Sequence, residues 1–425
     1  MDIQVFHCNS YLFTASKVIL LIYLLFISVI PVTAQDERAN LPAVLKNSYY
    51  EINFGYIDYP FGQESLEPGY TMESVKVPRP AIRLVLYGHE FNKYLSAQIT
   101  YMRPVLWVEY TYTKDDPAMK EGTPPENHKI RETQQVWMNV AGLTLKFQAP
   151  VGKKFSIFGE AGLGIVTRNG FENDITKQTV IKDANYATLL MGGGVRYQFS
   201  KKFGLMLSMT YSPPNNKEKQ PHTIFYSAGF SYKLLPPSEK QLEKGIKAGY
   251  IHPKQIIQIG FSGNAFGYDI NNFFSQKLII FWGGDVEVRH GLTICYTRNI
   301  FHTPKVFSFD WGVSFGYWQT NIDKTNFYTL SLFPLLRFTF LRTKPLDMYF
   351  FYSIAGPTFI SKYILDYNDT GGHFTFQDNM GIGIFFGDKR NINAEVKIGH
   401  YSNGNLLPKN GGIKIPLTFN LGYAF

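Results

Sequence analysis

The chain has 425 residues, a formal net charge of +9, 16% aromatic residues and only 18% charged residues. A soluble domain usually carries about 25% charged residues, so this composition argues against an ordinary soluble protein. The positive charge suits an anionic lipid surface, whereas no basic helix or aromatic stacking platform indicates a nucleic-acid partner. Cys295 is the only cysteine beyond residue 34, which excludes disulfide bonds and cysteine-based metal sites.

Residues 1–34 have the pattern of a secretory signal peptide. Lys17 precedes the apolar run Val18–Val32, and the small residues Val32 and Ala34 lie at the −3 and −1 positions of a cleavage site. The run of about 15 residues is shorter than the roughly 20 that a spanning helix needs, and no later segment supplies such a helix. We therefore expect an exported protein.

Alternation of apolar and polar residues dominates the rest of the chain. Phe307–Trp318 (FSFDWGVSFGYW) places aromatic and aliphatic side chains on one face of a strand and Ser, Asp and Gly on the other. Phe203–Ser212 (FGLMLSMTYS) repeats the pattern. Segments of about ten alternating residues are typical of a transmembrane β-barrel. A soluble β-sandwich is the alternative, but its strands rarely carry aromatics at both ends of so many segments.

The strand pattern divides the chain into two parts. About eight strands are expected from Tyr49 to Leu234 and about eight more up to the C-terminus, with a charged, proline-bearing connection over Leu235–Pro253. The predicted fold is all-β, with two tandem eight-stranded antiparallel barrels over residues 35–234 and 254–425. Residues 235–253 form a periplasmic linker in this prediction. One barrel of about 16 strands is the alternative.

The connections and the C-terminus agree with an outer-membrane barrel. Short basic turns such as Gly387–Arg390 contrast with long polar connections such as Pro213–Pro221, the asymmetry expected of such barrels. The final residues, FNLGYAF, end on Phe425 and resemble the C-terminal signal of outer-membrane barrels. This resemblance implies the outer membrane of a Gram-negative bacterium as the location and the barrel-assembly machinery as a partner.

A candidate catalytic pair lies near the end of the penultimate strand. In NINAEVKIGHYS, Ala394, Val396 and Ile398 share a face with His400 and Ser402. This apolar row should face lipid, so the pair is predicted to point outward at the end farthest from the periplasm. An imidazole within reach of a serine can take its proton and make it a nucleophile. The alternative is that the two residues are a hydrated polar pair at the membrane interface with no catalytic role.

The C-terminal part of the chain, Pro253–Phe425, resembles the lipid A deacylase (PagL-like) family. The resemblance lies in HYSN, which contains the pair, in PKNGG after it, and in a last strand that ends in Phe. The resemblance implies an eight-stranded outer-membrane barrel that hydrolyses an ester-linked acyl chain of lipid A. Its partners would be lipopolysaccharide and outer-membrane lipids, and it would need no cofactor and no metal. In this interpretation His400 is the base and Ser402 the nucleophile. The expected oxyanion or substrate-binding residues are Asn403, Gly404 and Asn410.

The third member of the catalytic set departs from the family. The family acid lies about fourteen residues after the histidine, where this sequence has Lys414, predicted to face the lumen. The preceding strand, His373–Gly387, descends to the short turn before the His400 strand, and outward residues must pair with outward residues. This register places His400 opposite Phe376 or Asp378. We therefore predict that Asp378 orients His400.

Two other functions are consistent with parts of the sequence. HYSNG also resembles the motif of outer-membrane phospholipase A, a family that uses calcium, although here the motif lies in the penultimate strand. A non-catalytic barrel, such as an adhesin, a small porin or a degenerate hydrolase, is the other alternative. The N-terminal half resembles outer-membrane barrels only in general.

Overall fold

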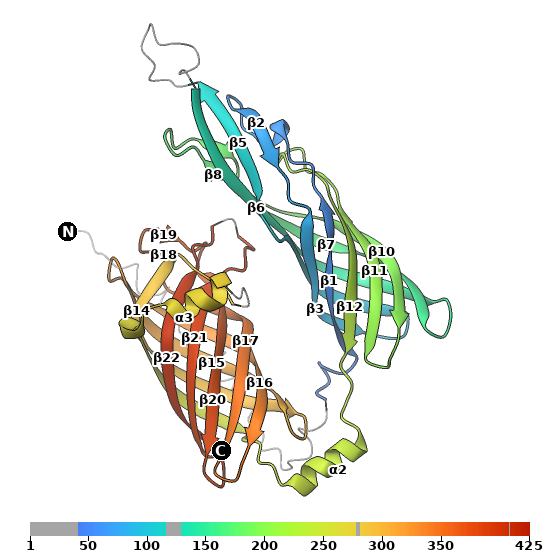
Figure 1. Cartoon of the computed structure of the whole chain (residues 1–425), viewed down its shortest axis with the longest axis vertical. Helices are drawn as coiled ribbons and strands as arrows, with labels where there is room; N and C mark the ends of the chain where they lie inside the picture. Colours follow the sequence, from blue (N-terminus) through green and yellow to red (C-terminus); the bar gives the residue numbers. More distant parts are fainter. Residues whose placement is uncertain (1–40, 116–128, 278–280, 408) are drawn as a thin grey trace, which may run out of the picture. The chain divides into compact units, whose positions relative to one another are not determined.

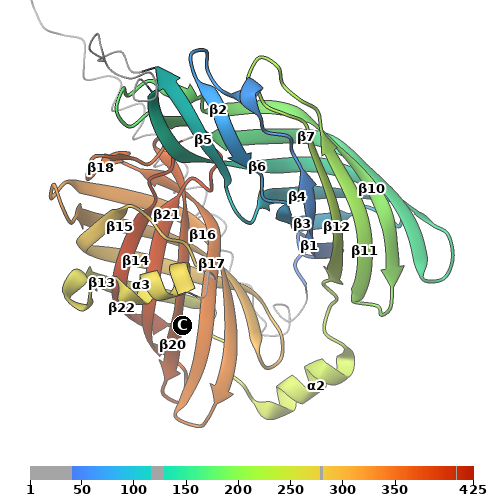
Figure 2. The same ribbon diagram turned by 45° about the horizontal axis from the view of Figure 1, so that its top comes forward.

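The computed structural model describes residues 41–115, 129–277, 281–407 and 409–425. The predicted signal peptide, residues 1–34, lies outside the described residues. No helix in the described part of the chain has the length and apolar character needed to cross a membrane. Two closed sheets of antiparallel strands account for most of these residues (Figures 1 and 2).

Eight strands of the N-terminal half pair in a closed ring, in the order β1-β3-β4-β6-β7-β10-β11-β12 and back to β1. The ring strands are β1 (Ser48–Asp58), β3 (Pro80–Glu90), β4 (Leu95–Pro104), β6 (Lys129–Pro150), β7 (Phe155–Asn169), β10 (Ala184–Gln198), β11 (Phe203–Ser212) and β12 (Thr223–Lys233). β5 (Val108–Asp115) pairs with the first residues of β6, and β2 (Thr71–Lys76) pairs with β5. These two strands extend the wall at one end of the barrel (Figure 1).

The interior of this barrel is polar, as the alternation predicts. Lys146 and Glu51 form a buried ion pair of 2.9 Å, and Arg83 and Glu160 form another of 2.8 Å. Apolar residues of the opposite parity, such as Leu207, are exposed on the outer surface. Buried charges are costly unless they are paired, and both pairs meet this requirement.

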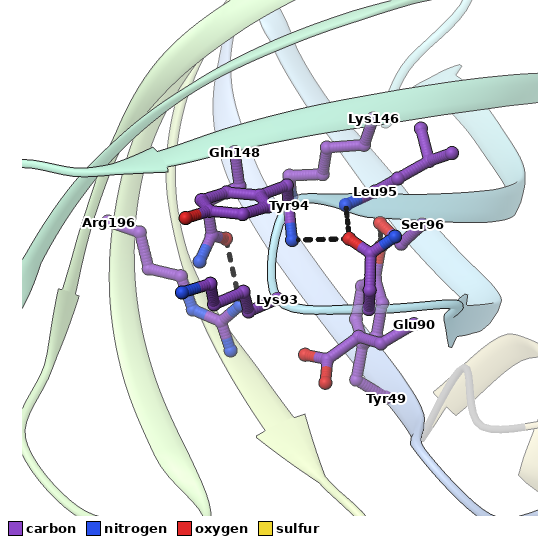
Figure 3. A pocket seen from close by; sticks show the side chains of 10 residues that line it. Tyr49, Glu90, Lys93, Tyr94, Leu95, Ser96, Lys146, Gln148 and Arg196 are labelled. Atoms are coloured by element: carbon purple, nitrogen blue, oxygen red, sulfur yellow. Dashed lines mark hydrogen bonds between the residues drawn. The ribbon is translucent and has the colours of Figure 1, made fainter.

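A small pocket lies at the short-turn end of the N-terminal barrel (Figure 3). The Tyr49 hydroxyl lies 2.9 Å from the Ser96 hydroxyl, and Arg196 donates to the Gln148 side chain at 3.4 Å. The backbone N–H groups of Tyr94 and the next residue donate to the Asn92 side chain. The pocket is therefore lined by polar residues of the barrel interior and of the adjacent turn, several of which hydrogen-bond to one another.

The C-terminal half forms a second closed barrel with the strand order β13-β14-β15-β16-β17-β20-β21-β22. Its strands are β13 (Gln255–Gly263), β14 (Val286–His302), β15 (Phe307–Thr320), β16 (Asn326–Arg342), β17 (Leu346–Ile360), β20 (Phe374–Phe386), β21 (Ile392–Ser402) and β22 (Ile413–Ala424). β13 and β22 pair and close the ring. The prediction of two eight-stranded barrels is therefore confirmed, and the single larger barrel is excluded.

Side chains of β15 face the two environments that their alternation predicts. Phe315 and Tyr317 are exposed on the outside, whereas Asp310 is buried inside and pairs with Arg337 at 2.7 Å. Glu395 on β21 is also inside, where it accepts a hydrogen bond of 2.7 Å from Tyr349. The barrel therefore has a polar interior and an apolar outer surface.

The two ends of the C-terminal barrel differ. Residues 303–306, 343–345 and 387–391 make short turns at the end where β13 begins and β22 ends, which we name the turn end. The connections at the other end, which we name the loop end, include residues 264–285, 361–373 and 403–412. The first of these contains the helix α3 (Asp269–Asn272) and the π-helical turn η5 (Phe273–Lys277), and the second contains the two-residue strands β18 (Ile364–Leu365) and β19 (Asn368–Asp369).

The predicted linker contains a helix, α2 (Glu239–Ala248), that the sequence analysis did not anticipate. Ser238 and Gln241 form a capping box at its start, with the Ser238 N–H donating to the Gln241 side chain at 2.9 Å. Gly249 ends the helix in the left-handed conformation that favours glycine. These local signals stabilise a short helix in which no residue is buried.

Candidate active site

Two neighbouring strands place the predicted catalytic residues at adjacent positions of the loop end. β20 and β21 are antiparallel, with Asp378 directly opposite His400 and Phe376 opposite Ser402. Ile382 lies on the same face of β20 as Asp378, nearer the turn end, and it is 53% exposed on the outer surface. His400, Ser402 and Asp378 therefore project outward from the barrel wall, in one of the two registers that the sequence allows.

A β-bulge changes the position predicted for Lys414. Lys397 pairs with Thr418, but Gly399 pairs with Ile415, so β22 advances three residues where β21 advances two. The additional residue reverses the alternation of β22 beyond this point. Lys414 therefore lies directly opposite His400 on the outward row, and the prediction that it faces the lumen is wrong. Pro416, which cannot donate a backbone hydrogen bond, lies within the bulge.

The Lys414 ammonium group has its own acidic partner. Its Nζ lies 3.0 Å from Oε1 of Glu287, the residue that pairs with Lys414 across the β14–β22 contact. The same Nζ lies 5.6 Å from the centre of the Tyr268 ring. Glu287 compensates a positive charge that would otherwise oppose protonation of the neighbouring imidazole.

Asp378 is held by a backbone donor. Its Oδ1 accepts a hydrogen bond of 2.7 Å from the backbone N–H of Ala355, and the indole of Trp282 lies close to the same carboxylate. Ala355 lies in an irregular part of β17 and has a φ of 51°. This left-handed conformation is uncommon for a residue with a side chain. The irregular backbone thus presents an N–H group to a carboxylate that is only 4% exposed.

The imidazole of His400 projects outward but is covered. It is 2% exposed, its Nδ1 has no hydrogen-bond partner within the described residues, and the Phe281 ring contacts it edge-on at 6.4 Å between centroids. α3 packs on β21 and β22 beside it (Figures 1 and 2). There, Asn271 donates to the carbonyl oxygen of Ile415 at 3.0 Å. In this conformation the connection between β13 and β14 separates the imidazole from the surroundings of the barrel.

The predicted oxyanion residues organise the connection between β21 and β22. The Asn403 side chain donates to the carbonyl oxygens of Thr370 and Lys409, and its N–H donates to Oδ1 of Asn410 at 3.0 Å. The Asn410 amide nitrogen donates to the side chain of Asn405. The Asn410 amide is therefore engaged within this loop, and the Asn403 amide also joins it to the connection that contains Thr370. Gly404, beside them, has a φ of 64° that favours glycine.

Sequence reasoning did not identify Phe281, Trp282, Ala355 or Glu287 as part of this site. They come from a neighbouring strand or from a long connection, and no local spacing relates them to His400. Within the described residues, no group of three or more His, Cys, Asp or Glu side chains is arranged to hold a metal ion.

Comparisons with known proteins agree with the division into two barrels. Residues 286–424 match the family model described as lipid A 3-O-deacylase (PagL), and residues 83–235 match the model of the OmpA-like transmembrane domain. No curated protein sequence matches the chain. The resemblance of the C-terminal half to PagL-like proteins, and of the N-terminal half to general outer-membrane barrels, is confirmed.

Several solved structures of outer membrane and surface proteins are similar to this chain. The crystal structure of the outer membrane enzyme PagL is 16% identical, covers 40% of this chain and 98% of its own, and has a TM-score of 0.28. Neisserial surface protein A (NspA) is 12% identical over 44% of this chain and 97% of its own, with a TM-score of 0.28. The N-terminal β-barrel domain of Pseudomonas aeruginosa OprF is 14% identical over 44% and 98%, with a TM-score of 0.26.

Proposed function

We propose that the C-terminal barrel is a serine esterase that removes an ester-linked acyl chain from lipid A in the outer leaflet of the outer membrane. The observation that carries the proposal is the outward-facing set of His400, Ser402 and Asp378 at the loop end of a barrel that matches the lipid A 3-O-deacylase model. In this proposal the chain is exported by its signal peptide and folded by the barrel-assembly machinery.

The proposed reaction proceeds through an acyl-enzyme. Ser402 Oγ attacks the ester carbonyl while His400 takes the hydroxyl proton, and the tetrahedral intermediate collapses when His400 gives that proton to the departing sugar oxygen. Water then attacks the acyl-serine, with His400 accepting its proton and returning it to Ser402. A free fatty acid leaves, and the lipid retains a hydroxyl group.

Asp378 takes the role of the acid that orients the imidazole. Directly opposed side chains lie roughly 4.5–5.5 Å apart at Cβ, which places a carboxylate within reach of the His400 ring after a side-chain rotation. Catalytic hydrogen bonds often tighten only when substrate is bound. Because Lys414 pairs with Glu287, the cation at the family's acid position does not cancel the effect of Asp378.

The loop after Ser402 supplies the groups that would stabilise the oxyanion. Asn403 and Asn410 hold the loop, and the backbone N–H groups around Gly404 act as oxyanion donors in this proposal. Such donors stabilise the charge of a tetrahedral intermediate when they point at the developing oxygen. If the Asn410 amide group released its hydrogen bond to Asn405 and donated to the substrate instead, it would add a further donor.

Incubation of the purified full chain with lipopolysaccharide in detergent tests the proposal. Release of one fatty acid per lipid A by the wild-type protein, and none by Ser402→Ala, is the expected result. Equal release by both proteins, or lysophospholipid formation with intact lipid A, would contradict it.

A further inference from the structure

The outer surface next to His400 carries a buried apolar cluster, which we name the Phe281 cluster. Its buried members are Phe281, Met380 and Ile398, and its partly buried members are Phe274, Phe350, Tyr352 and Leu417. Met380 and Ile398 face each other as the next outward pair after Asp378 and His400, on the side of the turn end. The cluster therefore begins beside the proposed catalytic residues and continues along the wall toward the middle of the strands.

The burial of this cluster is exceptional for its position. Outward residues of a membrane barrel are normally exposed to lipid, and Ile382, two residues further along the same strand, is 53% exposed. Met380 and Ile398 are only 4% and 2% exposed. Phe281 belongs to the same buried cluster as both residues, and its ring contacts the Tyr352 ring at 6.1 Å between centroids. A side chain from a connecting segment thus fills a space that lies against the barrel wall.

We propose that the Phe281 cluster is a binding site for the acyl chain of the substrate, and that the Phe281 side chain occupies this site until the chain enters. This inference rests on the proposed esterase function. An ester at the head-group level has its acyl chain directed toward the bilayer centre, which is the direction from Ser402 past Met380 and Ile398. The Met380–Ile398 pair lies about 7 Å along the strands from the Asp378–His400 pair. The Met380 and Ile398 side chains offer the apolar contacts that an acyl chain needs.

Displacement of Phe281 would also affect the proposed catalytic acid. Trp282 follows Phe281 directly, and its indole interacts with the Asp378 carboxylate. A movement of Phe281 and Trp282 that frees the cluster would withdraw the indole and leave the carboxylate available to the His400 ring. Entry of the acyl chain and orientation of the imidazole would then be linked in one step.

Chain-length preference tests this inference in the full chain, purified in detergent. We compare kcat/KM for p-nitrophenyl laurate and p-nitrophenyl butyrate in the wild type, Phe281→Ala and Phe281→Leu. Truncation to alanine leaves an apolar space that a longer chain can fill. The laurate-to-butyrate ratio should rise about ten-fold, as expected if about two more methylene groups become buried. Phe281→Leu should show a smaller rise.

Phe315→Ala serves as the matched control, because Phe315 is an exposed outward aromatic on β15 and is not a member of the cluster. Its ratio should equal that of the wild type. An unchanged ratio in both folded Phe281 variants, with the wild type active, would overturn the acyl site and leave the esterase proposal standing. Heat-modifiable migration in gel electrophoresis verifies that each variant is folded.

A wild-type protein that hydrolyses no ester would instead refute the proposed function. A diazirine-bearing palmitic acid then decides the binding site by photolabelling. Labelling of β20 and β21 at Met380 or Ile398 should be stronger in Phe281→Ala than in the wild type, and excess palmitate should suppress it. Equal labelling in the two proteins, or labelling elsewhere on the barrel, would overturn the site.

Discussion

Asp378 and His400 lie directly opposite each other on adjacent antiparallel strands, and both project from the outer surface of the barrel while being almost fully buried. Two polar groups on this surface are costly unless they have partners or a function. Asp378 has partners in Ala355 and Trp282, whereas Nδ1 of His400 has none among the described residues. A buried imidazole with an unsatisfied nitrogen, directly opposite a carboxylate in the strand register, is what the proposed site requires if the contact between the two groups forms when substrate displaces the Phe281 side chain.

Ser402→Ala and His400→Ala should each abolish ester hydrolysis while the barrel stays folded. Loss of one member of a serine hydrolase triad lowers the rate on the order of 10⁴-fold or more. Initial rates on lipopolysaccharide, with heat-modifiable migration as the measure of folding, provide the test. Substantial hydrolysis by folded Ser402→Ala would show that another residue is the nucleophile.

Asp378→Asn should lower the hydrolysis rate on the order of 10²-fold or more, because the amide cannot stabilise the imidazolium that forms on His400. Asp388→Asn is the matched control, since Asp388 is an exposed carboxylate in the turn of the same hairpin, at the opposite end of the strands. Similar, small effects of the two substitutions would mean that the site has no acid at Asp378.

Lys414→Glu should partly restore activity to Asp378→Asn. The bulge in β22 places position 414 directly opposite His400, so a carboxylate introduced there could orient the imidazole from the other side. Glu287→Gln is combined with it, because Glu287 lies beside position 414 and two carboxylates would repel each other. We expect a gain of about ten-fold in rate over Asp378→Asn/Glu287→Gln. No gain in a folded triple variant would contradict the placement of Lys414 beside the imidazole.

Chelation should leave activity unchanged. The proposed chemistry uses only side chains and backbone donors, so EDTA should not reduce the rate and added calcium should not raise it. Calcium-dependent restoration of activity after EDTA treatment would favour the outer-membrane phospholipase A interpretation instead.

Glu395→Ala should reduce the stability of the C-terminal barrel. Glu395 accepts hydrogen bonds from Tyr349 at 2.7 Å and Asn420 at 3.2 Å inside the barrel. Removal of the carboxylate leaves buried donors without acceptors, which costs about 1–3 kcal/mol. Urea unfolding in detergent, followed by tryptophan fluorescence, measures the change in the free energy of unfolding. An unchanged midpoint would show that water replaces the carboxylate at no cost.

The barrels and the Asp378 register could be predicted from sequence because a period of two fixes which side chains face outward, and a short turn fixes which residues pair. The position of Lys414 could not, because a single additional residue near Pro416 reverses the alternation, and local patterns do not reveal where a bulge falls. The roles of Phe281 and Trp282 are also invisible in the sequence. They reach His400 through tertiary packing, across more than a hundred residues of chain.

The most direct measurement of the central claim is mass spectrometry of lipid A from Gram-negative cells that produce the wild-type protein, Ser402→Ala or neither. Cells with the wild-type protein should contain lipid A that has lost the mass of one ester-linked acyl chain. Cells with Ser402→Ala should match cells without the protein. Lipid A of identical mass in all three, with the folded wild-type protein present in the outer membrane, would contradict the assignment of a lipid A esterase.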